Sequence, residues 1–416
     1  MKTKNNIIIL EGSKSILNRV LIISSFLPTP LEISNISHCD DVITLVNNLE
    51  KLGFHIKIKN NSLTIIPPKK ISNLQRLNIK DSGTAFRFLI SRLAVLEGIE
   101  SSIDVSLQLK CRPIKQLIEI LKRIGVDIRS EKFPIKIFGK KLIGGEYGIQ
   151  ANISSQFISS LLLISPLFQT DFILNLSGNV VSQSYIEMTL QIMKDFGIKS
   201  NYKEKRIIIP AGQYYINLKR YLIEPDFSSA CYFWALGSLS LNKICTFGNI
   251  KNSCQPDYKF LKILEKMGAQ IEMDNNKICV KKNKLCGIEV DFKDMPDQTP
   301  TLTILALLAN SPTKIKNISH LKFKESNRID ALIKEIRRIG GKISYEDNSL
   351  IINPLNFEPP KIKLNTYNDH RLVMSFYILK ALFPQIEIEN KECVKKSYPN
   401  FLKDFKKVTK TFNFIT

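Results

Sequence analysis

The sequence predicts an α/β protein built from copies of one repeat. Five pairs of a hydrophobic residue and a glycine recur at steps of 71 or 72 residues, and these pairs are Leu52-Gly53, Ile124-Gly125, Phe196-Gly197, Met267-Gly268 and Ile339-Gly340. Each pair ends an amphipathic run with Lys or Arg near its end. Such a period exceeds the roughly 20 to 50 residues of solenoid repeats and leaves room for about two helices and three or four strands. Each repeat is therefore a small α/β fold in itself.

The first helix of each repeat follows a short polar segment. These segments begin about 30 residues after each glycine, and once before the first glycine. They are Gly12–Ser15, Asp81–Thr84, Ile153–Gln156, Pro225–Ser229, Pro296–Thr299 and Asn368–Arg371, and the last of them adds a sixth repeat. Apolar runs of helical length follow, such as 157–167, so Ser, Thr, Asp and Asn are expected as N-caps. Six such helix N-termini would also favour anions, and they converge if the repeats pack symmetrically.

The second helix of each repeat ends at the periodic glycine. A glycine after a helix supplies the left-handed residue of a C-cap, and a cation in the last turn complements the helix dipole. Four of the five glycines lead into an alternating apolar strand, as at Phe54–Ile58.

Another polar series marks where these second helices begin. Its members are Asp40-Asp41, Cys111–Pro113, Ser182–Tyr185, Asp257-Tyr258, Lys324–Arg328 and Lys395–Pro399. Cations such as Arg112, Arg328 and Lys396 are unexpected there, because they oppose the positive end of the helix dipole. We infer that a bound anion offsets this cost.

The length of the chain indicates two or three domains, and its composition provides ample apolar residues for their cores. The chain has 416 residues, of which 44% are hydrophobic. No apolar run is long enough to span a membrane, and the run 7–10 is too short for a signal peptide, so we expect a cytoplasmic protein. The eight cysteines are scattered without a CxxC pair. This indicates neither a zinc site nor a disulfide framework, and we expect free reduced thiols.

The net charge of +22 raises the hypothesis of nucleic-acid binding. Lysines are spread over every repeat, however, and no basic element interleaved with aromatic residues occurs. We therefore expect no nucleic-acid partner, and a small anionic substrate that uses a few of the cations.

Seven motifs, in their order and spacing, resemble the 5-enolpyruvylshikimate-3-phosphate synthase family along essentially the whole chain. They are Gly12–Arg19, Ser82–Arg87, Arg112–Ile114, Ser154–Phe157, Asp226–Ala230, Lys324–Arg328 and Asn368–Arg371. The resemblance implies a transferase of the shikimate pathway, which leads to aromatic amino acids. Such an enzyme transfers the enolpyruvyl group of phosphoenolpyruvate to the 5-hydroxyl of shikimate 3-phosphate and releases phosphate, with no cofactor and no metal.

The resemblance also implies the domain organisation. We expect two similar domains, each of three βαβαββ repeats in an inside-out α/β barrel, with the active site in the cleft between them. Residues 14–224 would form the shikimate 3-phosphate side. Residues 1–13 and 225–416 would carry the catalytic carboxylates and the phosphoenolpyruvate side. The two substrates are the expected partners, and we expect a monomer.

Site residues follow from the matching motif positions. For shikimate 3-phosphate they are Lys14, Ser15, Arg19, Ser154, Ser155, Gln156, Ser182, Tyr185, Asp297, His320 and Lys324. For phosphoenolpyruvate they are Lys14, Asp81, Gly83, Arg112, Gln156, Arg328, His370, Arg371 and Lys396. Arginine suits this task because its planar fork pairs two oxygens of a carboxylate or phosphate.

Two carboxylates are the acid and base candidates. The resemblance implies that Asp297 takes the proton of the attacking hydroxyl and that Glu325 protonates the methylene carbon, giving a tetrahedral intermediate. Without its motif, Glu325 beside Lys324 equally fits a surface ion pair. His370, taken alone, equally fits a structural role.

The chain departs from the family pattern at several positions. These are Glu11 for the usual Pro, Asp81 for Asn, Pro225 for Gly, Asn327 and Asn400 for Asp, and His320 where Asn is frequent. Asp81 matters most, because its negative charge near phosphoenolpyruvate is expected to weaken binding.

Two alternative functions remain open. The sister family transfers enolpyruvyl to UDP-N-acetylglucosamine, but it has Lys-Asn where this chain has Lys14-Ser15. That family also carries a loop cysteine where Leu107 stands, and Cys111 is out of register. The second alternative, a non-catalytic relative that binds anions or nucleic acid, requires no acid/base pair such as Asp297 and Glu325.

Overall fold

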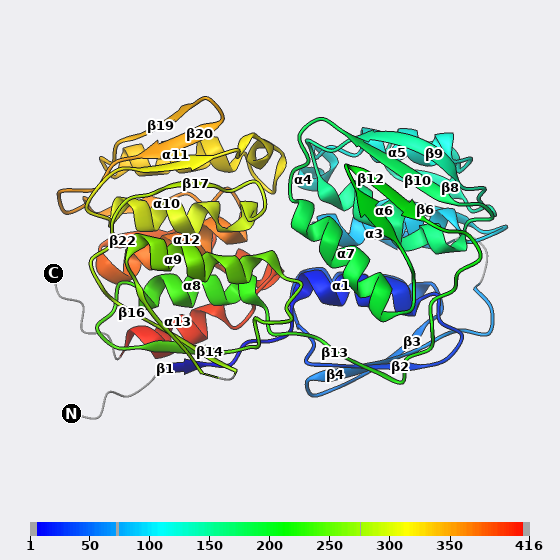
Figure 1. The fold of residues 1–416 in the computed structure, drawn as a ribbon, viewed down its shortest axis with the longest axis horizontal. Helices are drawn as coiled ribbons and strands as arrows, with labels where there is room; N and C mark the ends of the chain where they lie inside the picture. The colour runs from blue at the N-terminus through cyan, green and yellow to red at the C-terminus, as the bar shows by residue number, and fades with distance from the viewer. Residues whose placement is uncertain (1–5, 72–74, 275, 411–416) are drawn as a thin grey trace. The chain divides into compact units, whose positions relative to one another are not determined.

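The computed structural model describes residues 6–71, 75–274 and 276–410. The chain divides into two compact units (Figure 1). The N-terminal unit is Gly12–Ile223, and the C-terminal unit combines the chain up to Glu11 with the chain from Glu224 onward.

The N-terminal unit has three four-stranded sheets with one topology. In order across each sheet, the strands are β13 (Arg220–Leu222), β2 (Leu31–Ser34), β4 (Ser62–Ile66) and β3 (His55–Lys59); β5 (Gln75–Asn78), β6 (Glu100–Asp104), β8 (Ile135–Phe138) and β7 (Asp127–Ser130); and β9 (Gly145–Gln150), β10 (Phe172–Ser177), β12 (Arg206–Ile209) and β11 (Asn201–Lys203). The first pair is parallel and the next two are antiparallel. Its helices are α1 (Lys14–Ser24), α2 (Asp40–Lys51), α3 (Gly83–Ala94), α4 (Leu107–Lys110), α5 (Lys115–Arg123), α6 (Ser155–Ile164), η1 (Ser165–Leu167) and α7 (Gln183–Asp195).

The C-terminal unit repeats this topology twice and then in part. Its strands, in order across each sheet, are β1 (Asn6–Ile8), β14 (Ile244–Phe247), β16 (Lys277–Lys281) and β15 (Gln270–Asp274); β17 (Glu289–Asp291), β18 (Thr313–Lys316), β20 (Ser349–Ile352) and β19 (Ile343–Glu346); and β21 (Ile362–Leu364) with β22 (Ile386–Ile388). Its helices are α8 (Phe227–Gly237), η2 (Pro256–Lys259), α9 (Phe260–Met267), η3 (Pro296–Gln298), α10 (Thr299–Leu307), η4 (Ser319–Phe323), α11 (Arg328–Arg338), α12 (His370–Leu382), η5 (Lys391–Lys396) and α13 (Phe401–Thr409). Within the described residues, the sixth repeat thus lacks the last two strands of the pattern.

Two strands, β1 and β13, pair with strands that are distant from them in the sequence, and we call them exchanged strands. β1 pairs in parallel with β14 of the C-terminal unit, and β13 pairs in parallel with β2 near the start of the N-terminal unit. Each exchanged strand completes a sheet whose other three strands lie in a distant part of the sequence.

The first helix of each repeat forms the interior of its unit. Every residue of α8 and of α10 is buried, because these helices are apolar on all faces. Second helices such as α5 and α11 are amphipathic and bury one side only. In Figure 1, α8, α10 and α12 lie between the sheet of β19 and β20 and the sheet of β14 and β16. The helices are therefore inside and the sheets outside, which confirms the predicted α/β architecture of βαβαββ repeats.

The five periodic glycines all have left-handed backbone, as the sequence predicts. Their φ angles are 97° at Gly53, 104° at Gly125, 84° at Gly197, 106° at Gly268 and 87° at Gly340. In each copy, the amide after the glycine donates to a carbonyl in the last turn of the helix, at 3.0 Å for Val126 and 2.9 Å for Ala269. This is the Schellman arrangement, which a left-handed residue at the helix end makes possible.

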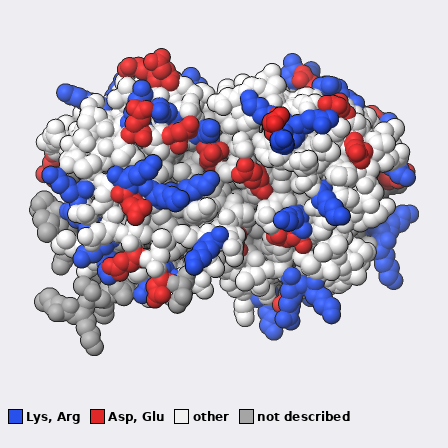
Figure 2. Space-filling view, in the orientation of Figure 1, with Lys and Arg blue, Asp and Glu red and all other residues white. Residues whose placement is uncertain are grey.

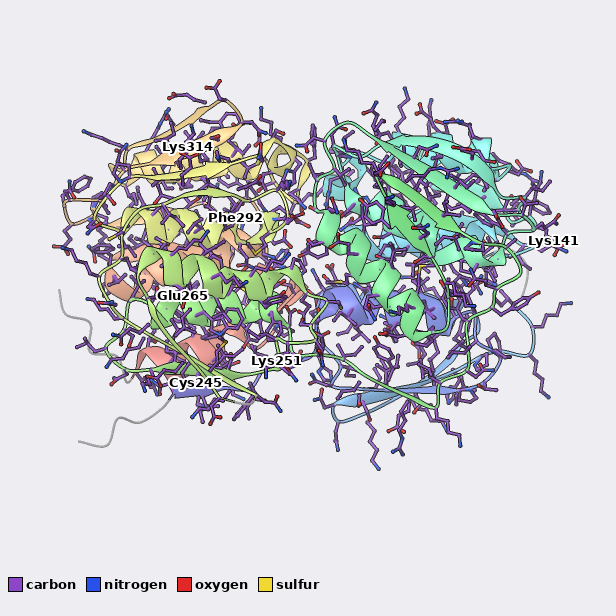
Figure 3. All side chains as sticks on the ribbon, in the orientation of Figure 1. Lys141, Cys245, Lys251, Glu265, Phe292 and Lys314 are labelled. Atoms are coloured by element: carbon purple, nitrogen blue, oxygen red, sulfur yellow. A yellow bond between two sulfur atoms is a disulfide. The ribbon has the colours of Figure 1, made fainter. Side chains whose placement is uncertain are left out.

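The prediction that all cysteines are free thiols is wrong for one pair. Cys245 of β14 and Cys279 of β16 form a disulfide (Cys245 is labelled in Figure 3). The two residues lie directly opposite each other in an antiparallel pair, where cross-strand neighbours come close enough to be bridged. Spacing along the sequence does not reveal that register. The other six cysteines form no disulfide within the described part of the chain.

Charged side chains are interspersed on the face shown in Figure 2. Lys and Arg are scattered among Asp and Glu rather than gathered into one basic stripe on that face. In the part of the chain that the structure describes, no helix is long and apolar enough to cross a membrane.

Candidate active site

Arg328 joins three carboxylates of the C-terminal unit. It is the first residue of α11 and its side chain is buried. Its Nη1 donates to Asp297 Oδ1 at 2.8 Å, its Nη2 to Glu325 Oε2 at 2.8 Å, and its Nε to Asp369 Oδ2 at 2.7 Å. Both predicted catalytic carboxylates are thus held on one guanidinium.

Asp297 is held by two arginines. It lies in η3, just before α10, and its Oδ2 accepts a hydrogen bond of 3.0 Å from Arg371 Nη2. Burial favours the neutral form of Asp297, but Arg371, Arg328 and Lys324 together hold the pKa of this carboxyl well below its usual range. Asp297 is therefore a carboxylate at neutral pH.

Arg371 is a second buried cation beside Asp297. Its Nη1 donates to the hydroxyl of Tyr232 at 3.1 Å, and burial raises the pKa of Tyr232 well above its usual value. Its Nε is enclosed and has no hydrogen-bond partner among the described residues. Tyr232, in the middle of α8, carries no motif that would have singled it out in the sequence.

Asp369 is a central residue to which the sequence interpretation gave no role. Its Oδ1 accepts the backbone amide of Arg371 at 2.9 Å and so caps α12, while its Oδ2 binds Ser326 at 3.0 Å in addition to Arg328. The carboxyl is fully buried. Its place between Asn368 and His370, in a capping segment, was the available signal. Asp369 orients both arginines.

Glu325 belongs to this buried network, which the interpretation as a surface ion pair does not describe. Its side chain is 17% exposed and pairs with Arg328, whose side chain is 1% exposed. Its side chain is therefore partly accessible from outside.

His320 lies in η4 and is 1% exposed. Neither ring nitrogen has a hydrogen-bond partner among the described residues. Burial, together with the positive charges of Lys324 and Arg328, lowers the pKa of His320 to about 3. His320 is therefore neutral over the physiological pH range.

The remaining predicted residues of the C-terminal unit lie at helix ends. His370 is the first residue of α12, and its Nδ1 is 3.9 Å from Asp369 Oδ1. Lys396 is the last residue of η5. Lys324 follows η4, and its charge acts on both Asp297 and His320.

In the N-terminal unit, Lys14 is the first residue of α1. Its Nζ lies 2.8 Å from Asp41 Oδ2, and both side chains are largely buried. Asp41 stands in the first turn of α2, where a carboxylate complements the helix dipole. The sequence placed Asp41 in the second polar series but did not identify it as the partner of Lys14.

Arg19 is a positioning residue in this structure. Its Nε donates to Thr189 Oγ1 at 2.7 Å, its Nη1 to the Ser15 carbonyl at 2.7 Å, and its Nη2 to the Tyr185 carbonyl at 3.2 Å. It is 2% exposed and therefore ties α1 to α7 from within the unit.

Gly83 leaves room for two arginines. A Cβ there would lie 2.6 Å from Arg112 Nη1 and 2.7 Å from Arg87 Nη1. Arg87 donates to the carbonyls of Gly83, at 2.9 Å, and Pro113, at 3.0 Å. A side chain at this helix start would therefore have to displace these guanidinium groups.

Asp81 accepts a hydrogen bond from the hydroxyl of Ser106. Ser106 is the N-cap of α4 and accepts the amide of Leu109. The extra negative charge at this departure from the family pattern thus lies at a helix N-terminus, where it is favoured.

Three of the six first helices have the predicted side-chain N-cap. Ser154 accepts the amide of Gln156 at 3.3 Å, Asp226 that of Ser229 at 3.2 Å, and Asp369 that of Arg371. The other three helices begin without a side-chain cap bond. Ser182, before α7, has φ of 54°, a left-handed conformation that serine seldom adopts.

The helix starts converge within each unit. In the N-terminal unit, Gln156 Nε2 donates to Thr84 Oγ1 at 3.0 Å, which links the first turns of α6 and α3, and Ser155 begins α6. In the C-terminal unit, Gln298 Nε2 donates to Asp257 Oδ1 at 2.9 Å and to the Ser228 carbonyl at 3.2 Å. These bonds join helix starts within each unit.

Two departures from the family pattern contact each other. Asn400 Nδ2 donates to Glu11 Oε1 at 3.1 Å, although the two residues lie 389 positions apart. A third departure, Asn327, caps α11 by accepting the amide of Asp330 at 3.3 Å. Each of these three side chains takes part in a hydrogen bond.

The matches to known proteins extend over nearly the whole chain. The family model of EPSP synthase (3-phosphoshikimate 1-carboxyvinyltransferase) matches residues 2–405. A 3-phosphoshikimate 1-carboxyvinyltransferase of Buchnera aphidicola subsp. Baizongia pistaciae (strain Bp) is 36% identical over 415 residues, which cover 97% of this chain and 96% of that protein. The protein of the same name from Haemophilus influenzae (strain PittGG) is 34% identical over 413 residues, covering 96% and 95%.

The fold is similar to that of solved structures. An EPSP synthase from Acinetobacter baumannii matches with a TM-score of 0.79 at 20% identity, over 96% of this chain and 94% of that chain. The repeat topology, the network around Arg328 and these matches lead to one conclusion: the chain belongs to the EPSP synthase family.

Proposed function

We propose that this protein transfers the enolpyruvyl group of phosphoenolpyruvate to the 5-hydroxyl of shikimate 3-phosphate, giving 5-enolpyruvylshikimate 3-phosphate and phosphate. The observation that carries the proposal is the pairing of Asp297 and Glu325 on Arg328, because addition and elimination require both a base and an acid. Family membership supplies the substrate class.

Phosphoenolpyruvate binds to the arginines of the network in this proposal. Arg328 and Arg371 present planar forks, whose N–H donors suit the oxygens of a carboxylate or phosphate. Lys396 and His370 complete this side, together with Gly83, Arg112, Asp81 and the shared Gln156 and Lys14.

Shikimate 3-phosphate binds to the N-terminal unit. Its proposed ligands are Lys14, Ser15, Ser154, Ser155, Gln156, Ser182 and Tyr185. Arg19 holds the backbone of Ser15 and Tyr185 and so positions these two ligands. From the C-terminal unit, Asp297, His320 and Lys324 are the further residues proposed for this substrate.

Asp297 acts as the base, and its arginine partners regulate its basicity. Burial favours the neutral form of Asp297, but Arg371 and Arg328 hold the pKa of this carboxyl well below its usual range, so it is a weak base. An anionic substrate on these guanidinium groups offsets their positive charge, which raises the proton affinity of the carboxylate. Basicity therefore increases when phosphoenolpyruvate binds.

Glu325 acts as the acid. The 5-oxygen bonds to C2 of phosphoenolpyruvate while the proton of Glu325 bonds to the C3 methylene, and Asp297 takes the hydroxyl proton. In the elimination, the C2–O bond to phosphate breaks and one C3 proton returns to the Glu325 carboxylate, which restores the double bond. The proton held by Asp297 passes to the released phosphate. Arginine and lysine donors stabilise the charges that develop in this step.

The proposed setting is the cytoplasm, with the two substrates as partners. We propose a monomer that needs no cofactor, no metal and no nucleic acid. Within the described residues, no group of three or more His, Cys, Asp or Glu side chains is arranged to hold a metal ion.

A phosphate-release assay with shikimate 3-phosphate and phosphoenolpyruvate tests the proposal. Turnover that depends on both substrates is expected. Phosphate release with UDP-N-acetylglucosamine in place of shikimate 3-phosphate would assign the protein to the sister activity. If phosphate is released with neither of the two acceptors, the result would favour the non-catalytic alternative.

A further inference from the structure

Arg92 is a buried cation with no acidic partner. It lies in the last turn of α3 and is 5% exposed, and no Asp or Glu oxygen lies within 4 Å of it in the described part of the chain. Its Nε donates to Ser25 Oγ at 2.8 Å and its Nη2 to the Ser25 carbonyl at 3.1 Å. Burial without a counter-charge lowers the pKa of Arg92 to about 10. A buried unpaired charge is costly, and a bound anion would reduce that cost.

Arg92 lines an open cavity of about 470 Å³. The other walls include Leu27, Phe54, Pro67, Lys69 and Lys70, and no acidic residue is among the described residues that line it. Lys69 and Lys70 are exposed at its rim, while Leu27 and Phe54 are buried. The cavity thus combines one cationic end with an apolar wall, within the size range of small-molecule sites.

The cavity is separate from the candidate active site. Ser25 is the C-cap of α1, and Arg92 is near the C-terminal end of α3, whereas Lys14 and Gly83 are the first residues of these helices. Ten residues of helix separate the two ends by about 15 Å. The residues proposed for the reaction therefore do not account for the cavity.

We propose that this cavity binds a small organic anion, whose carboxylate pairs with Arg92 and whose apolar body packs on the accessible side chains of Pro28, Pro67 and Pro68. The planar face of the Arg92 guanidinium is already fixed, because its Cζ stacks 4.6 Å from the centre of the Phe26 ring. A donor that is held in place in this way loses little freedom when it binds a carboxylate. The inference stands independently of the proposed function, since it involves none of its residues.

A role for Arg92 as a helix cap is the competing explanation. Its bonds to Ser25 stabilise the C-terminal end of α1, where a cation is favoured, and the same dipole disfavours an anion. A cap requires neither Lys69 and Lys70 nor the apolar wall. The two explanations differ in whether the cavity selects a charged ligand.

Calorimetric titration of the full-length protein with 3-phenylpropionate tests the proposal, with the neutral 3-phenylpropan-1-ol as the matched ligand. We expect saturable binding of the acid, with a Kd about tenfold lower than that of the alcohol, because a charge-assisted hydrogen bond is lost with the alcohol. Arg92→Gln is expected to weaken binding of the acid about tenfold. Arg129→Gln removes the same charge from an exposed position outside the cavity and is expected to keep the wild-type Kd.

Three results would overturn the proposal. They are no saturable binding of the acid at millimolar concentrations, equal Kd values for acid and alcohol, and an unchanged Kd in Arg92→Gln. If Arg92→Gln does not fold, the exposed double variant Lys69→Gln/Lys70→Gln provides the test. It is expected to raise the Kd about threefold, and an unchanged Kd would contradict the anion site.

Discussion

The Nη1 atom of Arg328 lies 2.8 Å from Oδ1 of Asp297. The same guanidinium binds Glu325 and Asp369, so one buried cation holds the proposed base, the proposed acid and the carboxylate that caps α12. The free energy of this arrangement depends on the fork geometry of arginine as well as on its charge.

We therefore expect Arg328→Lys to destabilise the protein by about 3 to 5 kcal/mol, because an ammonium group cannot replace three directed contacts to buried carboxylates. Chemical denaturation measures the change in unfolding free energy. Arg338→Lys is the matched control, since Arg338 lies on the same helix but its side chain is 45% exposed. Equal and small losses for the two variants would contradict the role of Arg328.

The lowered pKa of His320 leads us to expect that the free energy of unfolding falls as the pH is lowered. Its folded pKa of about 3 lies below the ordinary value of 6.5, so the unfolded state binds a proton first as the pH falls. The contribution of neutral His320 is fully present above pH 6.5 and declines toward pH 3, with a slope of up to about 1.4 kcal/mol per pH unit.

His320→Gln is expected to flatten the pH dependence of the unfolding free energy between pH 6.5 and 4, relative to wild type. Denaturation curves at several pH values measure the slope. His55→Gln, at an exposed residue of β3, is the control and is expected to leave the slope unchanged. An identical slope in His320→Gln and wild type would show that His320 titrates normally.

We expect the negative charge of Asp81 to affect the KM for phosphoenolpyruvate. We expect Asp81→Asn to lower the KM for phosphoenolpyruvate by about twofold to fivefold, because it removes a negative charge beside a bound anion. Steady-state kinetics at low ionic strength measure the change. Asp104→Asn, at a residue paired with Lys110, is the control for the loss of one charge. A higher KM in Asp81→Asn would mean that its bond to Ser106 organises the site.

The repeat supplies a matched pair of glycines. Gly125 and Gly268 both end helices with φ near +105°, but a Cβ at Gly268 would lie 2.5 Å from the Lys284 carbonyl oxygen, whereas nothing lies within 4 Å at Gly125. Both Ala variants incur a cost of about 1 kcal/mol for left-handed backbone.

Gly268→Ala is expected to lose at least about 1 kcal/mol more than Gly125→Ala, because the backbone oxygen must move. The difference in unfolding free energy measures this steric part directly. Equal losses in the two variants would mean that the backbone near Lys284 yields without cost.

Local signals made much of the fold predictable. The periodic glycines, the polar segments before apolar runs and the basic last turns are all features within a few residues. They matched the positions of the helices, although only three of the six polar segments supply a side-chain N-cap. Local signals did not predict the pairing of β1 with β14 or of β13 with β2, because it depends on strand pairing across most of the chain. Only the family resemblance implied that residues 1–13 belong with residues 225–416. The Cys245–Cys279 disulfide was not predicted either, since only the register of β14 on β16 brings the two sulfurs together.

The candidate site was predictable as a set of residues but not as a set of contacts. Motif positions identified Asp297, Glu325, Arg328 and Arg371. Asp369 and Asp41 were missed as partners because a capping or first-turn Asp looks the same in sequence whether or not it binds a distant cation. The supporting role of Arg19 depends on Thr189, which lies 170 residues away.

The most direct test of the central claim is phosphate release by wild type and by Asp297→Asn with shikimate 3-phosphate and phosphoenolpyruvate. We predict that the wild-type protein turns over both substrates. Asparagine keeps an acceptor for Arg328 but cannot take a proton, so the variant is predicted to bind shikimate 3-phosphate and to lose about 100-fold or more in kcat. Wild-type turnover that Asp297→Asn matches would contradict the account.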